Sequence, residues 1–371
     1  MTVRERILSV YRGETPDAVP CMLDLSHWFY HKHRLPWDLS VSYLEPEYEL
    51  IDYHKRMGVG FYVPHLGAFF DVAYGEDVQA AVIKSEDGLE ISWEFKTPVG
   101  VIRRTRRWEG QTYAWGVAEW GIRSEQDLRV LGYALASRRY TPRWERYQAW
   151  SDYVDDYGVV YLMPGYSAMG HLFNYWLGIE HTVYATIDWN STMHQVVDEI
   201  NANVLECIDL LAESPAEIIC LGDNFSSDIQ PPHFFEEWSR PFYAEAIHRL
   251  HAAGKYVAVH IDGKLRGSLA MFRDLGADCA DAVTPVPMGD LTPQACRDEA
   301  GPDVILSGGV SPNLWLPHTD VAQFDAAVLC WLDLRKRSPR LIANAGDQVP
   351  PGTDEDRIHR MRDLVDRHGR Y

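Results

Sequence analysis

The chain has 371 residues, of which 46% are hydrophobic and 24% are charged, and its formal net charge is -19 at pH 7. This length and composition suffice for a large core, and single barrel domains reach this size. An acidic surface repels nucleic-acid phosphates and anionic lipid heads, so neither nucleic acid nor a membrane is an expected partner. The charged start of the chain and the lack of an apolar run of about 18 residues predict a cytoplasmic protein.

Short β-rich segments alternate with longer helical stretches along most of the chain, which is typical of a parallel β/α architecture. Helices are predicted over residues 3–11, 47–57, 193–211 and 232–253. Eight strands are predicted, at residues 19–24, 60–64, 159–163, 217–222, 256–260, 279–283, 304–307 and 340–344. Eight parallel strands with intervening helices predict an α/β protein formed by one (β/α)8 TIM barrel, with residues 1–371 as a single domain.

Residues from about 80 to 108 interrupt this pattern. Two segments of alternating side chains, 89–95 and 101–108, flank a Pro-x-Gly turn, which predicts a β-hairpin inserted after the second strand. The second segment carries four arginines in an otherwise acidic protein: Arg103, Arg104, Arg106 and Arg107. A solvated face of the hairpin is the preferred interpretation of these arginines, and an anion-binding site is the alternative.

Catalytic groups of a parallel barrel lie at the C-terminal ends of the strands and in the loops that follow. Polar residues at these positions are therefore the candidate site residues. They are Asp24, His65, Tyr166, Asp223, Asn224, His260, Asp262, Asp347 and Gln348. Because a loop Asp or Asn often only caps the next helix, their convergence on one face of the barrel is the stronger argument.

The segment His260-Ile-Asp-Gly263 carries the sharpest local signal. Residues two apart in a strand point the same way, so His260 and Asp262 can face one point. Together with Asp347 after the last strand, they form a histidine and two carboxylates suited to a divalent metal with open positions. A hydrogen-bonded polar cluster, or a His–carboxylate pair for proton transfer, is the alternative.

Several motifs resemble those of the uroporphyrinogen decarboxylase superfamily, and they follow the family's order along nearly the whole chain. They are Gly13-Glu-Thr-Pro-Asp-Ala-Val-Pro20, Thr97-Pro-Val-Gly100, His260-Ile-Asp-Gly263, Gly308-Gly-Val310 and Val349-Pro-Pro-Gly-Thr353. The chain is more similar to the methyltransferase-like branch than to the decarboxylases. The resemblance implies a (β/α)8 barrel with its site in the mouth of the barrel.

In the corrinoid-linked methyltransferases of this superfamily, a His-x-Cys…Cys pattern holds zinc. By resemblance, the family's histidine matches His260, whereas its two cysteines fall on Asp262 and Asp347. Carboxylates make a harder site, open to zinc or another divalent ion, and they argue against methylation of a thiol. The arginine-rich Arg-Gln-Ala-Gly-Arg segment of the decarboxylases is absent, which argues against uroporphyrinogen as the substrate.

The preferred hypothesis is a small-molecule methyltransferase that is linked to a metal or to a corrinoid, with the corrinoid carried by a separate protein. One alternative is a metal-independent decarboxylase or lyase acting on a small carboxylic acid. Another is a non-catalytic ligand-binding barrel. A homodimer is the candidate oligomeric state.

Three roles are assigned to residues of the mouth. The expected metal ligands are His260, Asp262 and Asp347. The expected catalytic residues are His260, Asp262, Asp223, Asp24 and His65. The residues expected to contact the substrate are Trp28, Tyr30, Tyr166, Asn224 and Gln348.

Overall fold

The computed structural model describes residues 1–35, 37–39, 44–62 and 69–371. It confirms the α/β class, because five strands pair in parallel and in chain order. They are β9 (Ile218–Phe225), β10 (Tyr256–Ile261), β11 (Cys279–Val283), β12 (Ile305–Gly309) and β13 (Leu341–Asn344). A second parallel pair joins β1 (Met22–Leu23) to β2 (Gly60–Phe61). These seven strands lie at seven of the eight predicted positions.

Isolated parallel bridges connect the two sets of strands. They are Cys21–Ala343, Asp24–Gln348, Phe61–Gly158 and Leu162–Ile219. The strand predicted at 159–163 is therefore not a regular strand, because its segment makes only one bridge to each neighbour. The segment nevertheless lies between β2 and β9 in the order of the parallel strands.

One buried cluster contains a side chain from each of the eight predicted strands. These side chains include Met22, Tyr62, Tyr161, Ile218, Ala258, Cys279, Ile305 and Ile342. Helix α1 (Val3–Arg12) completes the cluster with apolar side chains of its own. The Tyr11 hydroxyl of α1 donates to the Tyr161 hydroxyl at 3.1 Å, and Arg340, just before β13, donates to the Tyr11 carbonyl. Helix α1 therefore covers the N-terminal ends of the strands.

Local sequence explains where α1 begins and ends. The Thr2 side chain accepts from the Glu5 backbone N–H, and the Glu5 carboxylate accepts from the Thr2 N–H, which forms a capping box. Gly13 ends the helix at φ 83°, a left-handed conformation that glycine adopts without steric cost. The helix is thus fixed at both ends before it packs under the strands.

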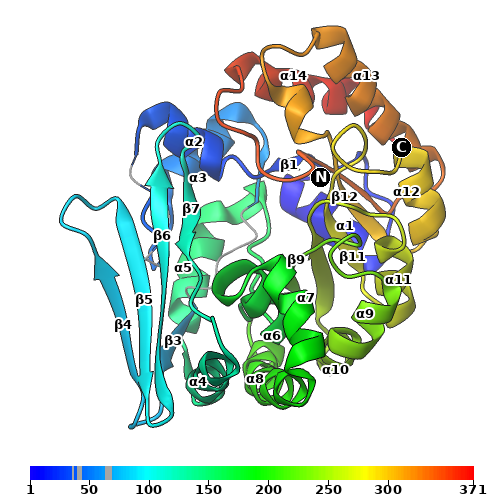
Figure 1. Cartoon of the computed structure of the whole chain (residues 1–371). Helices are drawn as coiled ribbons and strands as arrows, with labels where there is room; N and C mark the ends of the chain where they lie inside the picture. Colours follow the sequence, from blue (N-terminus) through cyan, green and yellow to red (C-terminus); the bar gives the residue numbers. More distant parts are fainter. Residues whose placement is uncertain (36, 40–43, 63–68) are drawn as a thin grey trace.

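Helices cover the outside of the parallel strands (Figure 1). They are α2 (Ser26–His33), α3 (Tyr48–Met57), α5 (Trp144–Val154), α6 (Ala168–His171), α7 (Ile179–Asp188), α8 (Asn190–Ala212), α9 (Pro232–Trp238), α10 (Arg240–Ala252), α11 (Ser268–Leu275), α12 (Pro293–Ala300), α13 (Val321–Leu332) and α14 (Glu355–His368). The single helix predicted over 232–253 is wrong: α9 and α10 meet at Ser239, because Pro241 suits only the first turn of a new helix. In the described part of the chain, no helix has the length and apolar character needed to cross a membrane.

An antiparallel sheet, larger than the predicted hairpin, follows β2. Its strands pair in the order β4 (Gln79–Lys84), β5 (Glu90–Thr97), β6 (Gly100–Glu109) and β7 (Ala114–Glu119). The predicted hairpin corresponds to β5 and β6, which turn between Thr97 and Gly100. Strand β4 was missed because all its residues are exposed, so its sequence lacks the alternation that reveals a half-buried strand.

This antiparallel sheet forms the left side of the molecule in Figure 1, with α4 (Glu125–Ala136) beside it. A short antiparallel pair, β3 (Phe70–Ala73) and β8 (Arg139–Pro142), lies next to it. Residues Leu172–Trp176, between α6 and α7, form a π-helical turn. These elements bring the inserted sheet against the segment that follows the third strand position.

Candidate functional site

A layer of polar side chains lies directly above the apolar cluster of the parallel strands. Each member stands two residues after an apolar member of that cluster: Asp24, His260, Asp281, Ser307 and Asn344. All five are at most 8% exposed. Because alternate residues of a strand share a face, this polar layer lies toward the C-terminal ends of the strands. We call this end the mouth.

His260 and Asp281 lie directly opposite each other on the paired strands β10 and β11. The Nδ1 atom of His260 is 3.1 Å from the Oδ2 atom of Asp281, and the Tyr62 hydroxyl donates to the same oxygen. Burial disfavours the imidazolium, but Asp281, together with Asp347 and Asp262, raises the pKa of His260 to about 9. His260 is therefore protonated at neutral pH.

Two further carboxyl groups of the mouth titrate close to neutral pH. Burial raises the pKa of Asp24 to about 6, although the Ser26 N–H and hydroxyl donate to its Oδ1 at 2.9 and 2.5 Å. Burial also raises the pKa of Asp347 to about 6, while the charge of His260 opposes the shift. The Oδ2 atom of Asp24 makes no hydrogen bond of normal geometry with the described residues. These groups can give and take protons near neutral pH.

Asp223 belongs to a neighbouring group at the end of β9. Its Oδ1 accepts from the Ser167 N–H at 2.8 Å, and its Oδ2 accepts from the hydroxyls of Ser167 and Tyr243. Gly170 permits this approach, since a Cβ atom there would stand 2.3 Å from Oδ1. Burial raises the pKa of Asp223 and these hydrogen bonds oppose the shift. Both oxygens are occupied, so we assign Asp223 a positioning role that ties the segment after residue 163 to β9.

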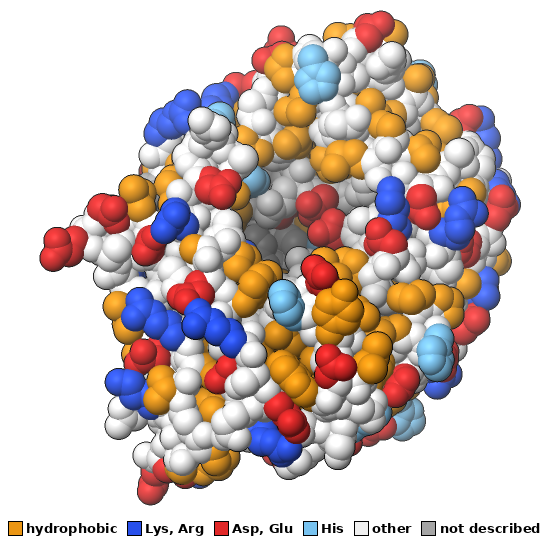
Figure 2. Space-filling model, viewed as in Figure 1, with side chains coloured by type: hydrophobic (Ala, Val, Ile, Leu, Met, Phe, Trp, Pro, Cys, Tyr) orange, Lys and Arg blue, Asp and Glu red, His pale blue; other side chains and the backbone are white. Residues whose placement is uncertain are grey.

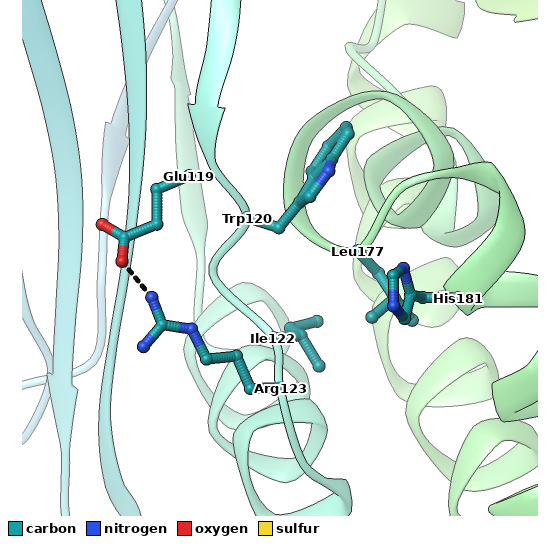
Figure 3. A pocket seen from close by; sticks show the side chains of 6 residues that line it. All are labelled: Glu119, Trp120, Ile122, Arg123, Leu177 and His181. Carbon is teal, nitrogen blue, oxygen red and sulfur yellow. Dashed lines mark hydrogen bonds and ion pairs between the residues drawn. The ribbon is translucent and has the colours of Figure 1, made fainter.

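The face shown in Figure 2 is hollowed near its centre, and Asp and Glu side chains gather at the edge of the hollow. A separate depression of about 310 Å³ is lined by Glu119, Trp120, Ile122, Arg123, Leu177 and His181. There, the Arg123 guanidinium pairs with Glu119, while His181 stands on the opposite side, on α7 (Figure 3). None of the acid–base groups of the mouth lines this depression, so we place the candidate active site in the mouth.

Comparison with protein families gives a match to the uroporphyrinogen decarboxylase (URO-D) family over residues 166–368, which is more than half of the chain. The chain belongs to the uroporphyrinogen decarboxylase family. The matched residues include His260, Asp281 and Asp347, so the family region contains most of the mouth's acid–base groups. Membership confirms the family that the sequence motifs indicated.

A solved structure shows a similar fold over nearly the whole length of this URO-D family member. A methyltransferase from Methanosarcina mazei matches with a TM-score of 0.63 at 14% identity, covering 99% of each chain. A type I 3-dehydroquinate dehydratase from Clostridium difficile matches at 10% identity with a TM-score of 0.27, over 50% of this chain and 76% of the other. A D-psicose 3-epimerase from Clostridium cellulolyticum H10 matches at 10% identity with a TM-score of 0.36, over 66% and 83%. The last two scores are too low to support an argument. No curated protein matches the chain.

The predicted metal ligands of this URO-D family member do not form a pre-formed metal centre in the described part of the chain. Among the described residues, no three His, Cys, Asp or Glu side chains are grouped as a metal ion requires. The Nδ1 atom of His260 faces Asp281 at 3.1 Å, so only its Nε2 atom could face a ligand. Asp262 is exposed, beyond the end of β10. Asp347 is close enough to His260 to affect its pKa.

Two of the predicted substrate contacts lie in the packing of α2. Trp28 is 2% exposed, its indole N–H donates to the Thr353 carbonyl at 2.8 Å, and the Lys32 ammonium lies over its ring. Tyr30 is also buried and stacks on Trp37. These contacts account for both aromatic residues as packing residues.

The other predicted residues have different positions. Gln348 pairs with Asp24 through a parallel backbone bridge, which places it in the mouth. Asn224 has a φ of 52° near the end of β9, an uncommon conformation for a residue with a side chain. Tyr166 is partly exposed and close enough to Asp223 for the carboxylate to raise its pKa, after the larger effects of burial and Tyr175. His65 lies outside the described residues.

Sequence reasoning missed Asp281, the direct partner of His260. It lies inside the strand predicted at 279–283, whereas the candidate positions were the last residues of strands and the loops that follow them. The available signal was an ionisable residue in an apolar strand, two positions after Cys279. The next residue, Ala282, has a φ of 60°, and the pairing of β11 with β12 shifts there. Such backbone strain is concentrated at functional sites.

Proposed function

We propose that the chain is a methyltransferase-like enzyme acting on small molecules, with its site in the mouth of a closed (β/α)8 barrel. Three backbone bridges support closure of the barrel. Cys21, just before β1, bridges to β13, residue 158 bridges to β2, and residue 162 bridges to β9. The cluster with a member from every predicted strand supports closure as well. The observation that carries the activity is the pairing of buried His260 with Asp281, which raises the pKa of His260 to about 9 despite burial.

Loss of a methyl group from an oxygen or nitrogen atom is favoured when the leaving atom receives a proton. His260 donates that proton from Nε2, because Asp281 accepts a hydrogen bond from Nδ1 and stabilises the imidazolium. The C–O or C–N bond breaks as the methyl group passes to a nucleophile, and the demethylated product leaves protonated. The Asp347 carboxylate, ionised above about pH 6, relays a proton from water back to His260.

A corrinoid on a separate protein would supply the nucleophile that takes the methyl group. No step of this proposal uses a metal ion, because the described donors are not grouped for one. The alternative activity is a metal-independent decarboxylase or lyase. It is favoured by the same protonated His260, which would protonate the carbanion that remains after a small acid loses carbon dioxide.

The test uses the purified chain with cob(I)alamin and a panel of methoxylated and methylaminated small molecules. We expect methylcobalamin to form, detected by its absorbance, and the rate to fall by about 100-fold or more in His260→Gln. His251→Gln is the matched control, because His251 forms a similar pair with Asp278, at 2.8 Å, on the protein surface.

Two results would count against methyl transfer. Carbon dioxide release from small acids without a corrinoid, lost in His260→Gln, would support the lyase instead. Equal rates in the His260→Gln and His251→Gln variants would show that His260 takes no part in the chemistry.

A further inference from the structure

Arg104 on β6 is a buried cation that makes no hydrogen bond to the described residues. It is 6% exposed, and its Nε atom has no partner among the described residues. The guanidinium carbon lies 3.9 Å from the centre of the Trp93 ring and 4.4 Å from that of Tyr175. Burial lowers the pKa of Arg104 to about 9, so the group stays charged at neutral pH. This contradicts the solvated hairpin face expected for this arginine. A buried charge without an acceptor is costly, which calls for a functional explanation.

Two more unpartnered donors belong to Arg138 and His171. The Nε atom of Arg138 donates to the Leu135 carbonyl and to Asn203, and its Nη1 lies 3.3 Å from His171 Nε2, but its Nη2 has no partner in the described part of the chain. Burial and the charges of Arg138 and Arg104 hold the pKa of His171 well below its usual range. The neutral ring accepts at Nε2, which assigns its proton to Nδ1, and this buried N–H is also unpartnered.

Several charged and aromatic side chains lie around the ring of Tyr175. Arg104 and Arg106 lie 4.4 and 5.5 Å from its centre, and the rings of Tyr166 and His171 lie 5.0 and 6.2 Å away. Unlike Arg104, the side chains of Arg106, Tyr166, His171 and Tyr175 are partly exposed. We call Arg104, Arg106, Arg138 and His171 the arginine cluster.

Among the described residues, no Asp or Glu forms an ion pair with the arginines of the cluster. The groups that most affect the pKa of Arg104, after burial, are Tyr175, Arg106, Tyr74 and Tyr166. Tyr175 itself lies on the π-helical turn, a form of helix that is frequent at functional sites. The cluster thus combines positive charge, unused donors and an irregular backbone in one place.

The arginine cluster borders the mouth. Arg106 donates to the Asn174 carbonyl at 2.6 Å, and the Asn174 amide donates to the Asp223 carbonyl at the end of β9 at 3.1 Å. Strand β9 pairs with β10, which carries His260. Two hydrogen bonds thus connect the arginine cluster to the strand that neighbours β10.

We propose that the arginine cluster binds an oxyanion, a carboxylate or a phosphate, carried by the substrate. Arg104, Arg138 and His171 donate hydrogen bonds to it, and the rings of Tyr166 and Tyr175 form the walls. This inference rests on the proposed function in one respect: the same molecule presents its reacting end to His260. The proposed substrate is therefore a small molecule that carries an anionic group.

Binding is measured without turnover, by tryptophan fluorescence and thermal unfolding, with sodium benzoate and sodium phosphate as probes at constant ionic strength. We expect a saturable fluorescence change, since Trp93 contacts Arg104, and a higher melting temperature. Arg104→Met should weaken binding by about tenfold or more and keep the melting temperature of the anion-free protein. Arg104→Lys, which keeps the charge but loses the planar fork, should also weaken binding.

Arg107→Gln is the matched control, because Arg107 is on the same strand but is exposed and paired with Glu90. It should bind both probes as the unchanged protein does. A lack of saturable response to either probe, or equal affinity in the Arg104→Met and Arg107→Gln variants, would overturn the proposal. A preference between benzoate and phosphate identifies which oxyanion the substrate carries. His260→Gln should retain binding, so lost methyl transfer with retained binding concerns the proposed function and not this site.

Discussion

Two groups of buried cations border the mouth, and they differ in how their charge is balanced. The His260 imidazolium lies 3.1 Å from Asp281, with Asp347 close by. Arg104 instead stacks on aromatic rings and has no carboxylate partner in the described part of the chain. The charge of His260 is balanced by a carboxylate of the protein, whereas the charge of Arg104 is not balanced by any described residue. In the proposed roles, the protein itself supplies the negative charge that balances His260, which transfers protons. The negative charge that balances Arg104 comes from the ligand.

Removing the counter-charge of His260 should have the largest effect. Asp281→Asn leaves His260 buried without the partner that contributes most to raising its pKa, so this pKa should fall from about 9 to below 6.5. Loss of one partner of a buried pair should also lower the free energy of unfolding by about 3 kcal/mol. Nitrogen-detected NMR titration of the histidines and urea denaturation measure the two effects. His251 should titrate as before in the variant, and a His260 that still titrates near 9 would contradict the assignment.

The same pair predicts how stability depends on pH. The pKa of His260 is about 9 in the folded chain and 6.5 in the reference state, so folding binds the proton more tightly. The resulting stabilisation, about 3 kcal/mol, is complete below about pH 6.5 and is lost as the pH rises through 9. Urea denaturation at pH 6.5 and at pH 9.5 should show this difference. His260→Gln should remove it; an undiminished difference would assign the pH dependence to other groups.

The arginines of β6 should respond differently from each other. Arg106→Met loses hydrogen bonds to the Trp115 and Asn174 carbonyls and should lower the free energy of unfolding by about 1–2 kcal/mol. Arg104→Met loses no hydrogen bond, and relief of an unpaired buried charge offsets its lost contacts with the rings, so the change should stay within about 1 kcal/mol. Urea denaturation without added anion measures both. Equal destabilisation would make Arg104 a structural residue.

Divalent metals should have the smallest effect. Because the described residues hold no grouped donors, added zinc or a chelator should leave the melting temperature and the histidine titration of the purified chain unchanged. Elemental analysis of the same samples, with His260→Ala and Asp347→Ala for comparison, provides the check. About one equivalent of zinc in the unchanged protein, lost in both variants, would contradict this prediction and support the metal site expected from the sequence.

The parallel strands could be predicted from sequence because each is a short apolar run, and seven of the eight positions have regular strands. The mouth could be predicted in part. His260 was found through its spacing to Asp262, but its partner Asp281 is distant in sequence, and only the register of β10 on β11 brings the two together. Register depends on tertiary packing, which a single sequence does not reveal.

The arginine cluster was misjudged for a related reason. The sequence alone does not distinguish the four arginines of β6 from one another. In the structure, Arg104 is buried and Arg107 is exposed. Alternation along β6 predicts that residues 104 and 106 share a face. What this face contacts depends on the π-helical turn about 70 residues later, which no local pattern indicates. Tertiary contacts therefore decided which arginines are buried.

Helix α1 closes the N-terminal ends of the strands through Tyr11 and its apolar neighbours. Any ligand of the polar layer must then approach it from the opposite end, the mouth. If the proposed methyl carrier docks at the mouth, it would cover the route that the small molecule takes. The proposed reaction would then require the small molecule to bind before the carrier, and the product to leave after it.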